Sequence, residues 1–508
     1  MQLRNMNTEK SWTGRLVQTL MSVWLLFAVA ACGVSPVSTV RRGALRDIRD
    51  RDLLLAVCGP SGCDDAPAGP WAPSAAGRHP GQNGPLTPEQ QAMAKAAWQY
   101  FENNYQEETG LVNAVNEYPS TTMWDTASYL AALVSAHQLG VIDKTVFDLR
   151  VVKAVTALNT LSLFHDKLPN KVYNTKTLEK VDYGNNPGEI GYSAIDIARL
   201  LIWLSIIKQD YPEHGNIIDR TVLRWNFQHI LDGPGSMYGA GITDDKKVEY
   251  YQEGRLGYEE YAAKAFQIWG FTTTRASKPE PYNLVSMYGI DIPYDSRDPR
   301  TLHAHNYVVC ESYILDAIEF NWDLANDDTS DDMHHSDSVV ADFAQRVYKV
   351  QEARYAVEGI LTARTEHQLD QAPYFIYDTI YSDGQRWNTL MGDTGKSYPE
   401  FSAVSLKAAL GLWAVWDTEY TRLLYAATAN LYDPKKGFYE GLYENGKGLI
   451  KSFTANNNGI ILEALLYKVK GKLHRKRSSA SLWDSVVTDE FKNYGHCYPN
   501  DRNCGARK

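Results

Sequence analysis

The chain has 508 residues, with 51 Lys and Arg against 61 Asp and Glu, which gives a formal net charge of −10 at pH 7. Because binding to nucleic-acid phosphates needs a basic surface, this balance argues against a nucleic-acid partner. Hydrophobic residues make up 44% and charged residues 22% of the chain, an ordinary globular composition that excludes wholesale disorder and allows one large domain with appendages.

The first 31 residues have the pattern of a bacterial export signal. Basic residues precede a mostly apolar run that ends at Val29, and two small residues follow. Cys32 comes next, and residues 29–32 resemble the lipobox, whose Cys is lipidated after cleavage. We therefore expect a lipoprotein signal peptide over 1–31 and a lipid anchor in a membrane of the cell envelope, at the outer membrane or periplasm of a Gram-negative host. A plain secretory signal is the alternative, since the run is too short for a comfortable membrane span.

The remaining cysteines form two close pairs and a single residue. Cys58 and Cys63 close one short loop, and Cys497 and Cys504 close another. Since disulfides persist outside the cytosol, we expect each of these four residues to pair with its neighbour. Cys310 lies in an apolar stretch, where a buried inert thiol is expected rather than a nucleophile.

Residues 87–470 are expected to form the folded domain, between a tether and a tail. Residues 32–86 mix charges with Pro, Gly and Ala and lack sustained apolar periodicity, which is typical of a flexible tether. At the start of the domain, Thr87 and Gln90 supply an N-cap and a capping-box glutamine around a proline. The tail, 471–508, adjoins a basic stretch that we expect to be solvated or close to a membrane.

Apolar residues recur at spacings of three and four in many segments of the domain, which predicts amphipathic helices. The segments are 88–104, 124–139, 144–163, 193–208, 215–231, 256–270, 307–320, 337–358, 400–416, 419–431 and 455–468. Loops rich in Gly, Pro, Asn and Asp separate them, with short β-prone pieces such as Tyr374 to Tyr381. The expected fold is all-α, an (α/α)6 toroid of six helical hairpins. An α-solenoid is the alternative, and the lack of a sequence repeat at a fixed period argues against it.

In a toroid the loops at one rim gather over a central cavity, so acids near helix starts are the first candidates for chemistry. Asp182 begins a segment whose Gly/Asn/Pro turn exposes its neighbours, and this turn allows Glu189 to face the cavity. Asp196 lies seven residues further on, two turns up the same helix face. Helix capping is the alternative role for acids in a first turn.

Two further acidic clusters adjoin predicted helices. Glu259 and Glu260 point about 100 degrees apart on a helix, so at most one of them can face the cavity. Glu311 interrupts an apolar run, as a buried acid with a task or a partner does. His303 and His305 have a spacing that could bind a metal on a strand, but no third ligand matches, and loop histidines are the alternative. We expect no metal and no cofactor.

These acids suit glycoside hydrolysis, which needs a protonated carboxyl group on one side of the bond and a carboxylate on the other. The chain also holds 32 Tyr and 13 Trp, whose rings suit stacking on sugars, although core packing is the alternative for any single ring. We expect Trp124, Tyr192, Tyr258 and Trp387 to bind sugar. No Gly-x-Ser-x-Gly elbow, Walker loop, Rossmann fingerprint or His-Glu-x-x-His motif offers a rival chemistry.

Several motifs in one order resemble the family DUF3131, a bacterial group of domains of unknown function often classed as glucoamylase-like. The resemblance covers roughly residues 92–467. It rests on the segments 109–112, 124–129, 252–261, 310–316 and 454–458. Cys310 and Ser312 depart from the Ser-Glu-Pro-Tyr pattern expected around Glu311, which leaves the acid in place but loosens the local match.

A wider resemblance is to the glycoamylase-like β-1,2-glucanases, which are also (α/α)6 toroids. Residues 189–196 are similar to their Glu-Leu-Ser-Thr-Ile-Asp segment with two residues inserted, and residues 257–260 are similar to their Gly-Tyr-Asn-Glu. This resemblance implies that Glu189 and Glu260 are the essential acids, and it puts Asp182 in a supporting position.

Glu311 joins these two acids as a third catalytic candidate, and Asp125, Asp182 and Asp196 are expected to contact the substrate. The expected function is hydrolysis or transglycosylation of a bacterial glucan or exopolysaccharide. The alternative is a non-catalytic lipoprotein of the cell envelope that binds polysaccharide or scaffolds an export machine. Convergence of the two essential acids on one groove with room for a sugar would favour the enzyme.

Overall fold

The computed structural model describes residues 79–279, 281–297, 306–327, 329, 333–392, 396–475 and 481–488. These residues all belong to one compact unit, assigned to Arg49–Lys508. The predicted signal peptide, the lipidation site Cys32, the four cysteines expected in disulfides, and both His303 and His305 lie outside the described residues. Among the helices described, none is long and apolar enough to cross a membrane.

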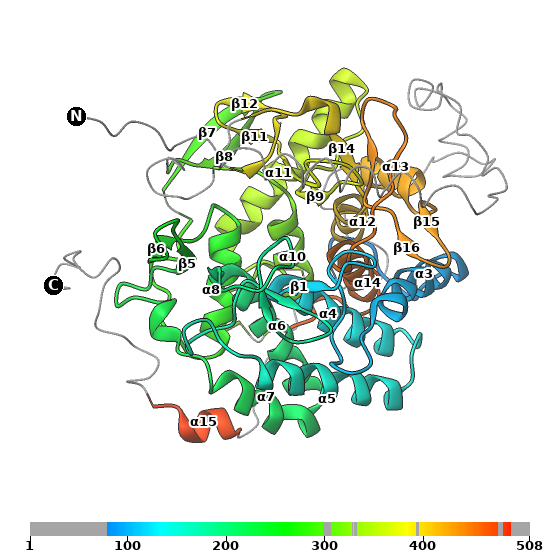
Figure 1. Cartoon of the computed structure of the whole chain (residues 1–508). Helices are drawn as coiled ribbons and strands as arrows, with labels where there is room; N and C mark the ends of the chain where they lie inside the picture. Colours follow the sequence, from blue (N-terminus) through cyan, green and yellow to red (C-terminus); the bar gives the residue numbers. More distant parts are fainter. Residues whose placement is uncertain are drawn as a thin grey trace, which may run out of the picture. The chain divides into compact units, whose positions relative to one another are not determined.

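Six helices form an inner ring. They are α4 (Met123–Gln138), α6 (Ala194–Asp210), α8 (Tyr258–Ile268), α10 (Glu311–Phe320), α12 (Leu406–Val415) and α14 (Ala455–Lys470). Each packs against the next, and α14 packs against α4, which closes the ring. Figure 1 shows the six around a common centre. Every residue of α10 and of α12 is buried, as expected for helices enclosed on all sides.

A second set of helices packs outside this ring. In the described residues these are α3 (Pro88–Asn104), α5 (Lys144–Thr160), α7 (Gly215–Val222), α11 (Ser338–Glu358) and α13 (Glu419–Thr428). They pack on inner helices, as α3 does on α14 and α13 does on α12, and they lie further from the centre in Figure 1. Between α8 and α10 the hairpin of β7 (Tyr282–Met287) and β8 (Ile290–Asp295) packs on α11. The mostly helical, alternating arrangement is the one that the sequence predicts.

Short antiparallel sheets lie just before several inner helices. The other strands are β1 (Ser120–Thr122), β2 (Val172–Asn174), β3 (Lys180–Val181), β4 (Gly191–Tyr192), β5 (Tyr238–Ile242), β6 (Val248–Gln252), β9 (His367–Gln368), β10 (Phe375–Asp378), β11 (Tyr381–Ser382), β12 (Gln385–Arg386), β13 (Thr389–Leu390), β14 (Ala403–Ser405), β15 (Tyr432–Asp433), β16 (Gly437–Phe438), β17 (Gly441–Tyr443) and β18 (Leu449–Ile450). Strands β1, β4 and β14 lead directly into α4, α6 and α12, and they pair in the register Thr121↔Tyr173, Tyr192↔Ala240 and Val404↔Leu442. These pairings fix where three inner helices begin.

The predicted helix bounds hold within three residues except in three places, one of which is the start of the predicted helix 307–320, since α10 begins only at Glu311. The capping box at Thr87 is confirmed, since its hydroxyl accepts the N–H of Gln90 and the Gln90 amide accepts the N–H of Thr87. The predicted helix 215–231 is wrong beyond Val222, where the chain turns into the short 3-10 helix Phe227–His229. The predicted start at residue 400 is also wrong. There a 3-10 turn and β14 bury apolar side chains with a spacing that imitates a helix.

The basic stretch that begins at Lys468 is solvated only in part, because Lys470 is exposed whereas Lys468 and Lys472 are buried, and residues 476 and 477 lie outside the described residues. The Lys468 ammonium donates to backbone carbonyls at Asn83, Gly84 and Pro85. Lys472 is 3% exposed and lies 2.7 Å from the carboxylate of Asp323. Carbonyl and carboxylate partners offset the cost of removing these cations from water.

The packed unit extends past both predicted boundaries of the domain. His79, inside the predicted tether, is buried with its ring 4.1 Å from that of Tyr467. On the other side, Trp483 of the short helix α15 (Leu482–Val486) is buried, and its ring lies 4.9 Å from that of Trp269. Residues 79–86 and 481–487 therefore pack as part of the helical domain.

Candidate functional site at the mouth of the ring

Five of the six inner helices are tied together at their first residues. Trp124 of α4 donates its indole N–H to Asn456 of α14 at 3.1 Å, and the Asn456 amide donates to Glu311 of α10 at 3.0 Å. Lys407 of α12 forms an ion pair with Glu311. The ring of Tyr258, the first residue of α8, lies 5.7 Å from that of Trp124. The helix starts therefore share one end of the ring, which we call the mouth.

Ser193, the N-cap of α6, joins two acids of the mouth. Its hydroxyl oxygen lies 3.0 Å from Asp196 Oδ1 and 2.6 Å from Glu253 Oε1. Glu253 follows β6 directly and also accepts the backbone N–H of Ala194 at 2.5 Å. The two carboxyl groups are thus held within two hydrogen-bond lengths of each other, although they come from different parts of the chain.

The single hydrogen of the Ser193 hydroxyl favours a proton on one of the two acids. The Ser193 oxygen already accepts the backbone N–H of Asp196 at 3.1 Å, and a hydroxyl has a single hydrogen to donate. If that hydrogen goes to Glu253, the contact with Asp196 is satisfied only when the Asp196 carboxyl carries a hydrogen and donates it to Ser193. Glu253 then accepts from the hydroxyl and from a backbone N–H, which stabilises its anion.

Electrostatics also place the proton on Asp196. Desolvation, followed by the negative charge of Glu253, raises the pKa of Asp196 to about 7, and the charge of Asp125 adds to the effect. Asp196 is nevertheless partly exposed, so a ligand can reach it. A carboxyl group that keeps its proton near neutral pH in a reachable position can act as a general acid.

Asp125, in the first turn of α4, is the second reachable acid of the mouth. It accepts the hydroxyl of Thr122 at 2.8 Å. Desolvation raises the pKa of Asp125, while Thr122 and the positive charges of Arg199 and Lys407 lower it. The surroundings therefore differ, because Asp196 has anions as its main charged neighbours and Asp125 has cations. Such a contrast pushes the pKa values of two carboxyl groups apart.

The indole of Trp124 is held firmly beside Asp125. The Arg199 guanidinium lies 4.7 Å from the indole centroid, and the ring of Tyr261 meets it edge-on at 6.3 Å. With its N–H bound to Asn456 the ring is fixed, yet the residue is partly exposed. A fixed, accessible aromatic ring next to carboxyl groups suits the stacking of a sugar.

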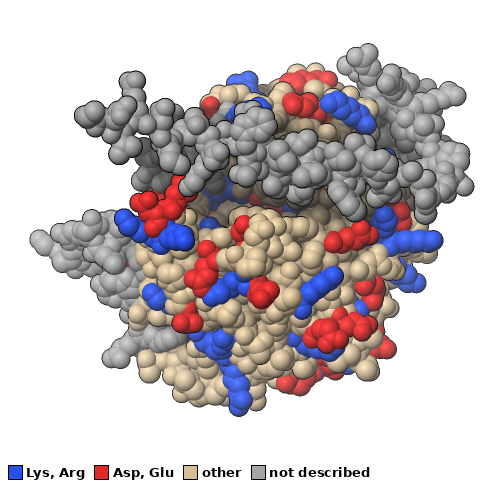
Figure 2. Space-filling model, viewed as in Figure 1, with Lys and Arg blue, Asp and Glu red and all other residues tan. Residues whose placement is uncertain are grey.

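Deeper in the ring, two of the acids are paired with cations. Arg199 lies 2.7 Å from Glu463, and the side chains of both are fully buried. Lys264 of α8 lies 2.7 Å from Asp316 of α10, again with both side chains buried. On the surface, Figure 2 shows Lys and Arg interspersed with Asp and Glu over the visible face.

The family model of DUF3131, described as a protein of unknown function, matches residues 92–471. The chain belongs to the DUF3131 family. The predicted resemblance is confirmed over almost the same range of residues. No curated protein matches the chain.

Solved structures share the fold of this DUF3131 protein at low sequence identity. An endo-β-1,2-glucanase from Chitinophaga pinensis, in complex with sophorotriose and glucose, has a TM-score of 0.52 at 13% identity, over 76% of this chain and 93% of that one. A Bacteroides caccae protein provisionally named a glucoamylase has a TM-score of 0.53 at 13% identity, over 75% and 92%. An endo-β-1,2-glucanase from Talaromyces funiculosus, in complex with sophorose, has a TM-score of 0.50 at 11% identity, over 76% and 85%.

Glu189 and Glu260 occupy different settings in this DUF3131 protein. Glu189 is partly exposed, forms an ion pair with Lys180 and lies 3.4 Å from Nε2 of His165. Glu260 is 2% exposed and accepts the N–H of Gly257 at 2.6 Å, which caps the start of α8. No hydrogen bond or ion pair joins the two acids in the described part of the chain, and their catalytic role stays a prediction.

The other predicted residues divide into buried and accessible ones. Tyr192 and Tyr258 are 1% and 3% exposed, and the Tyr258 hydroxyl donates to Glu366 inside the protein. Trp387 is partly exposed with the Arg354 guanidinium 4.4 Å from its centroid. The prediction for Cys310 is confirmed, because it is a buried free thiol whose pKa is raised by desolvation.

Asp182 has a local structural role. Its carboxylate accepts the backbone N–H of Asn186 at 2.8 Å and lies 3.1 Å and 3.2 Å from the amide nitrogen of the same residue. The Asn186 backbone N–H, more than any other contact, lowers the pKa of Asp182. Asp182 therefore stabilises the turn that it begins, and a direct contact with substrate stays a prediction.

Sequence reasoning did not select Glu253 or Ser193. Glu253 lies in segment 252–261, one of the segments on which the resemblance to DUF3131 rests. In that segment the sequence singles out the adjacent acids Glu259 and Glu260, and both of these are buried. The signal that could have found it is an acid immediately after an exposed, β-prone stretch, because a strand end delivers its next residue to the loop. Ser193 reads as an ordinary N-cap, and only the fold reveals its second partner.

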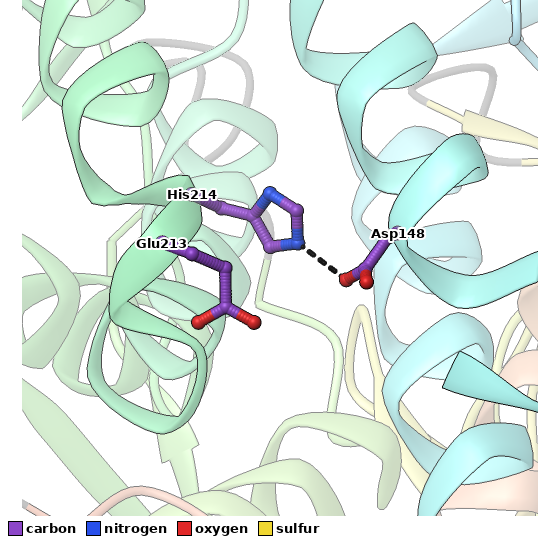
Figure 3. Close-up of side chains that lie close together, drawn as sticks. All are labelled: Asp148, Glu213 and His214. Carbon is purple, nitrogen blue, oxygen red and sulfur yellow. Dashed lines mark hydrogen bonds and ion pairs between the residues drawn. The ribbon is translucent and has the colours of Figure 1, made fainter. Parts of the chain in front are cut away.

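A group of three potential metal ligands lies on outer elements of the fold and contains none of the mouth residues. Asp148 of α5 and Glu213 and His214 of the 3-10 helix η1 (Pro212–His214) approach one another, as Figure 3 shows, with His214 Nε2 2.8 Å from Asp148. The Lys144 ammonium lies 2.6 Å from both acids. Lys144 thus supplies the positive charge, and the group is an ion-pair cluster.

Proposed function

We propose that this DUF3131 protein is a glycoside hydrolase that acts on a bacterial glucan, with Asp196 as the general acid. The observation that carries the proposal is the Ser193 hydroxyl shared between Asp196 and Glu253, whose single hydrogen favours a proton on one of the two carboxyl groups. Because Glu253 has two donors and lies beside Asp196, it acts as a positioning residue that keeps the proton on Asp196.

In this mechanism Asp196 donates its proton to the glycosidic oxygen that leaves. Asp125, an acid on the neighbouring helix α4, faces the other side of the bond, and its cationic neighbours Arg199 and Lys407 favour its anion against the desolvation that raises its pKa. It acts on the sugar as the second carboxylate of the pair, directly or through water. Trp124 stacks on a sugar ring next to the bond that breaks.

The choice of a glucan rests on two lines of support. The Chitinophaga pinensis and Talaromyces funiculosus proteins that share the fold are β-1,2-glucanases with bound sophoro-oligosaccharides. The export signal and lipobox pattern of the sequence support a location in the cell envelope, where glucans and exopolysaccharides are accessible. The lipid anchor at Cys32 is part of the proposal.

The test is reducing-sugar release from a panel of bacterial glucans, including β-1,2-glucan, by the purified full-length chain. Asp196→Asn and Asp125→Asn are each expected to lower kcat by about 10²–10⁴-fold, because each removes a proton-transfer or charge-stabilising group. Glu253→Gln is expected to keep activity but to move the alkaline limb of the pH profile below its position near pH 7, since the neighbouring negative charge is lost.

Glu189→Gln and Glu260→Gln, measured in the same assay, separate this assignment from the one that the wider resemblance implies. If both abolish release and Asp196→Asn does not, Asp196 is not the acid. Silence of the parent on every glucan together with retained glycan binding would favour the polysaccharide-binding or scaffold alternative.

A further inference from the structure

The sheet of β9, β10 and β13 presents an accessible aromatic face. Strand β10 carries Phe375, which is 42% exposed, and Tyr377, which is partly exposed. Ile376 between them is fully buried, so the two rings share the opposite face of the strand, and their centroids lie 5.4 Å apart. Gln368 of β9, also partly exposed, pairs with Phe375 and therefore lies on the same face. Exposed rings are common on protein surfaces, so the surroundings decide whether this face has a role.

Arg255 connects this face to the mouth of the ring. Its guanidinium carbon lies 5.3 Å from the centroid of the Tyr377 ring and 4.3 Å from that of the Tyr258 ring. Tyr258 is the mouth residue whose ring lies 5.7 Å from that of Trp124. The carboxylate of Glu366, just before β9, lies 2.7 Å from the Arg255 guanidinium and accepts the Tyr258 hydroxyl at 2.7 Å. The aromatic face of the sheet therefore adjoins the mouth.

The rings of this face are held in place from behind. The ring of Tyr307, which is 3% exposed, lies 4.7 Å from that of Tyr377, and its hydroxyl donates to the carbonyl oxygen of Gly392 at 2.7 Å. The backbone of Tyr377 pairs with Leu390 of β13. Rings that are already ordered bind the apolar face of a ligand at a low cost in entropy. Since Glu366 neutralises the charge of Arg255, an uncharged ligand suits this face.

We propose that Phe375, Tyr377 and Gln368 form a distal sugar subsite, which binds a part of the glucan chain away from the bond that breaks. The inference rests on the proposed function and deepens it, because it makes the protein selective for long glucan chains. The rings offer apolar faces to pyranose C–H groups, and the Gln368 amide offers a donor and an acceptor to hydroxyl groups. Successive contacts through Tyr258, Arg255 and Tyr377 separate Phe375 from Trp124, so only a chain of several sugar units spans both.

Tyr282 offers a matched control for Phe375. It also lies on a strand, β7, and it is 39% exposed. Its ring meets that of Phe343 edge-on at 5.0 Å, much as the ring of Phe375 meets that of Tyr377. Phe343 belongs to α11, which contains none of the mouth residues. Replacing Tyr282 therefore removes a ring of similar exposure and packing from a different face.

The experiment compares a long and a short ligand in the full-length chain. KM and kcat are measured with β-1,2-glucan and with sophorotriose, or with whichever glucan of the panel the parent hydrolyses and the trisaccharide of that glucan. Phe375→Ala is expected to raise KM about 10-fold for the polymer but less than about 2-fold for the trisaccharide, because only the polymer reaches the subsite. Phe375→Tyr keeps a ring and is expected to stay within about 3-fold on the polymer. Tyr282→Ala is expected to match the parent on both ligands.

Binding is measured separately by calorimetry in an Asp196→Asn background, where hydrolysis does not consume the ligand. Phe375→Ala is expected to weaken binding of the polymer about 10-fold, and Gln368→Ala to weaken it about 3-fold, as the loss of a ring contact and of one hydrogen bond do. The unfolding midpoint of Phe375→Ala is expected to match that of Tyr282→Ala, since both rings are exposed to a similar degree.

The outcomes separate the two proposals. Hydrolysis by the parent with an unchanged KM for the polymer in Phe375→Ala overturns the distal subsite and leaves the proposed function intact. Equal losses on the polymer and the trisaccharide overturn it as well, because a disturbed mouth affects both ligands. If the parent binds a glucan but hydrolyses none, the proposed function fails, and calorimetry of Phe375→Ala beside Tyr282→Ala still decides on the subsite. If the parent neither binds nor hydrolyses any glucan of the panel, both proposals fail.

Discussion

Two acids at the mouth of the ring, Asp125 and Asp196, differ from Glu463 inside it in their partners. Asp125 and Asp196 lie in the first turns of α4 and α6, and within the described residues no Lys, Arg or His nitrogen comes within 4.0 Å of either carboxylate. One turn further along α6, Arg199 is buried against Glu463 at 2.7 Å. A buried charge needs a partner of opposite charge, so a buried ion pair is accounted for by a structural role alone. Reachable acids with raised pKa values and no cation are the ones that need a functional explanation.

The largest expected effect on stability lies inside the ring. Arg199→Met leaves the buried carboxylate of Glu463 without its cation, so the free energy of unfolding is expected to fall by about 3–5 kcal/mol in urea or guanidinium titrations. The double variant Arg199→Met/Glu463→Leu should recover much of that loss, because it removes the orphaned charge as well. A single variant as stable as the parent would contradict the contrast between the interior and the mouth.

At the mouth the expected change has the opposite sign. The pKa of Asp196 in the folded chain, about 7, exceeds its usual value of 3.8. The penalty for ionising it is therefore absent below about pH 4, grows as the pH rises and is complete above pH 7. Asp196→Asn removes that penalty and should stabilise the chain at pH 8 by about 1–3 kcal/mol after allowance for partial exposure, with little difference at pH 4. Denaturant titrations at both pH values measure this difference. A variant less stable than the parent at pH 8 would contradict a raised pKa of Asp196 in the folded chain.

The smallest effect is expected on the outer ring. Lys144 bridges Asp148 and Glu213, but its side chain is 44% exposed. Water screens such pairs, so Lys144→Met should change the free energy of unfolding by less than about 1 kcal/mol. A thermal or denaturant titration with salt as a second variable checks this. A loss comparable to that of Arg199→Met would show that exposure is a poor guide to the importance of a charge here.

The sequence predicts the helices well because their signals are local. The capping box at Thr87 and the spacing of apolar residues in α3 lie within one short segment, and the helix begins and ends where predicted. The predicted helix 215–231 fails where buried apolar residues belong to a turn and a 3-10 helix instead. Periodicity cannot tell these apart, since both bury residues at similar spacings.

The site is less predictable because its decisive contacts join distant residues. Asp125, Asp196 and Trp124 are expected near the substrate from the sequence, and the structure places them at one end of the ring. The partnership of Ser193 with Glu253 spans 60 residues, and the Tyr258 hydroxyl finds Glu366 across 108. No local pattern reveals whether an acid near a helix start meets a cation, a backbone N–H or another acid.

The shared direction of the six inner helices has an electrical consequence. Each helix start carries about half a positive charge from its aligned peptide dipoles, so six starts around one opening contribute roughly three charges before screening. The backbone itself thus acts as a counter-ion for Asp125 and Asp196, which have no basic side chain within 4.0 Å in the part of the chain that the structure describes. This positive potential offsets part of the negative charge at the mouth, while desolvation still keeps the pKa of both acids raised.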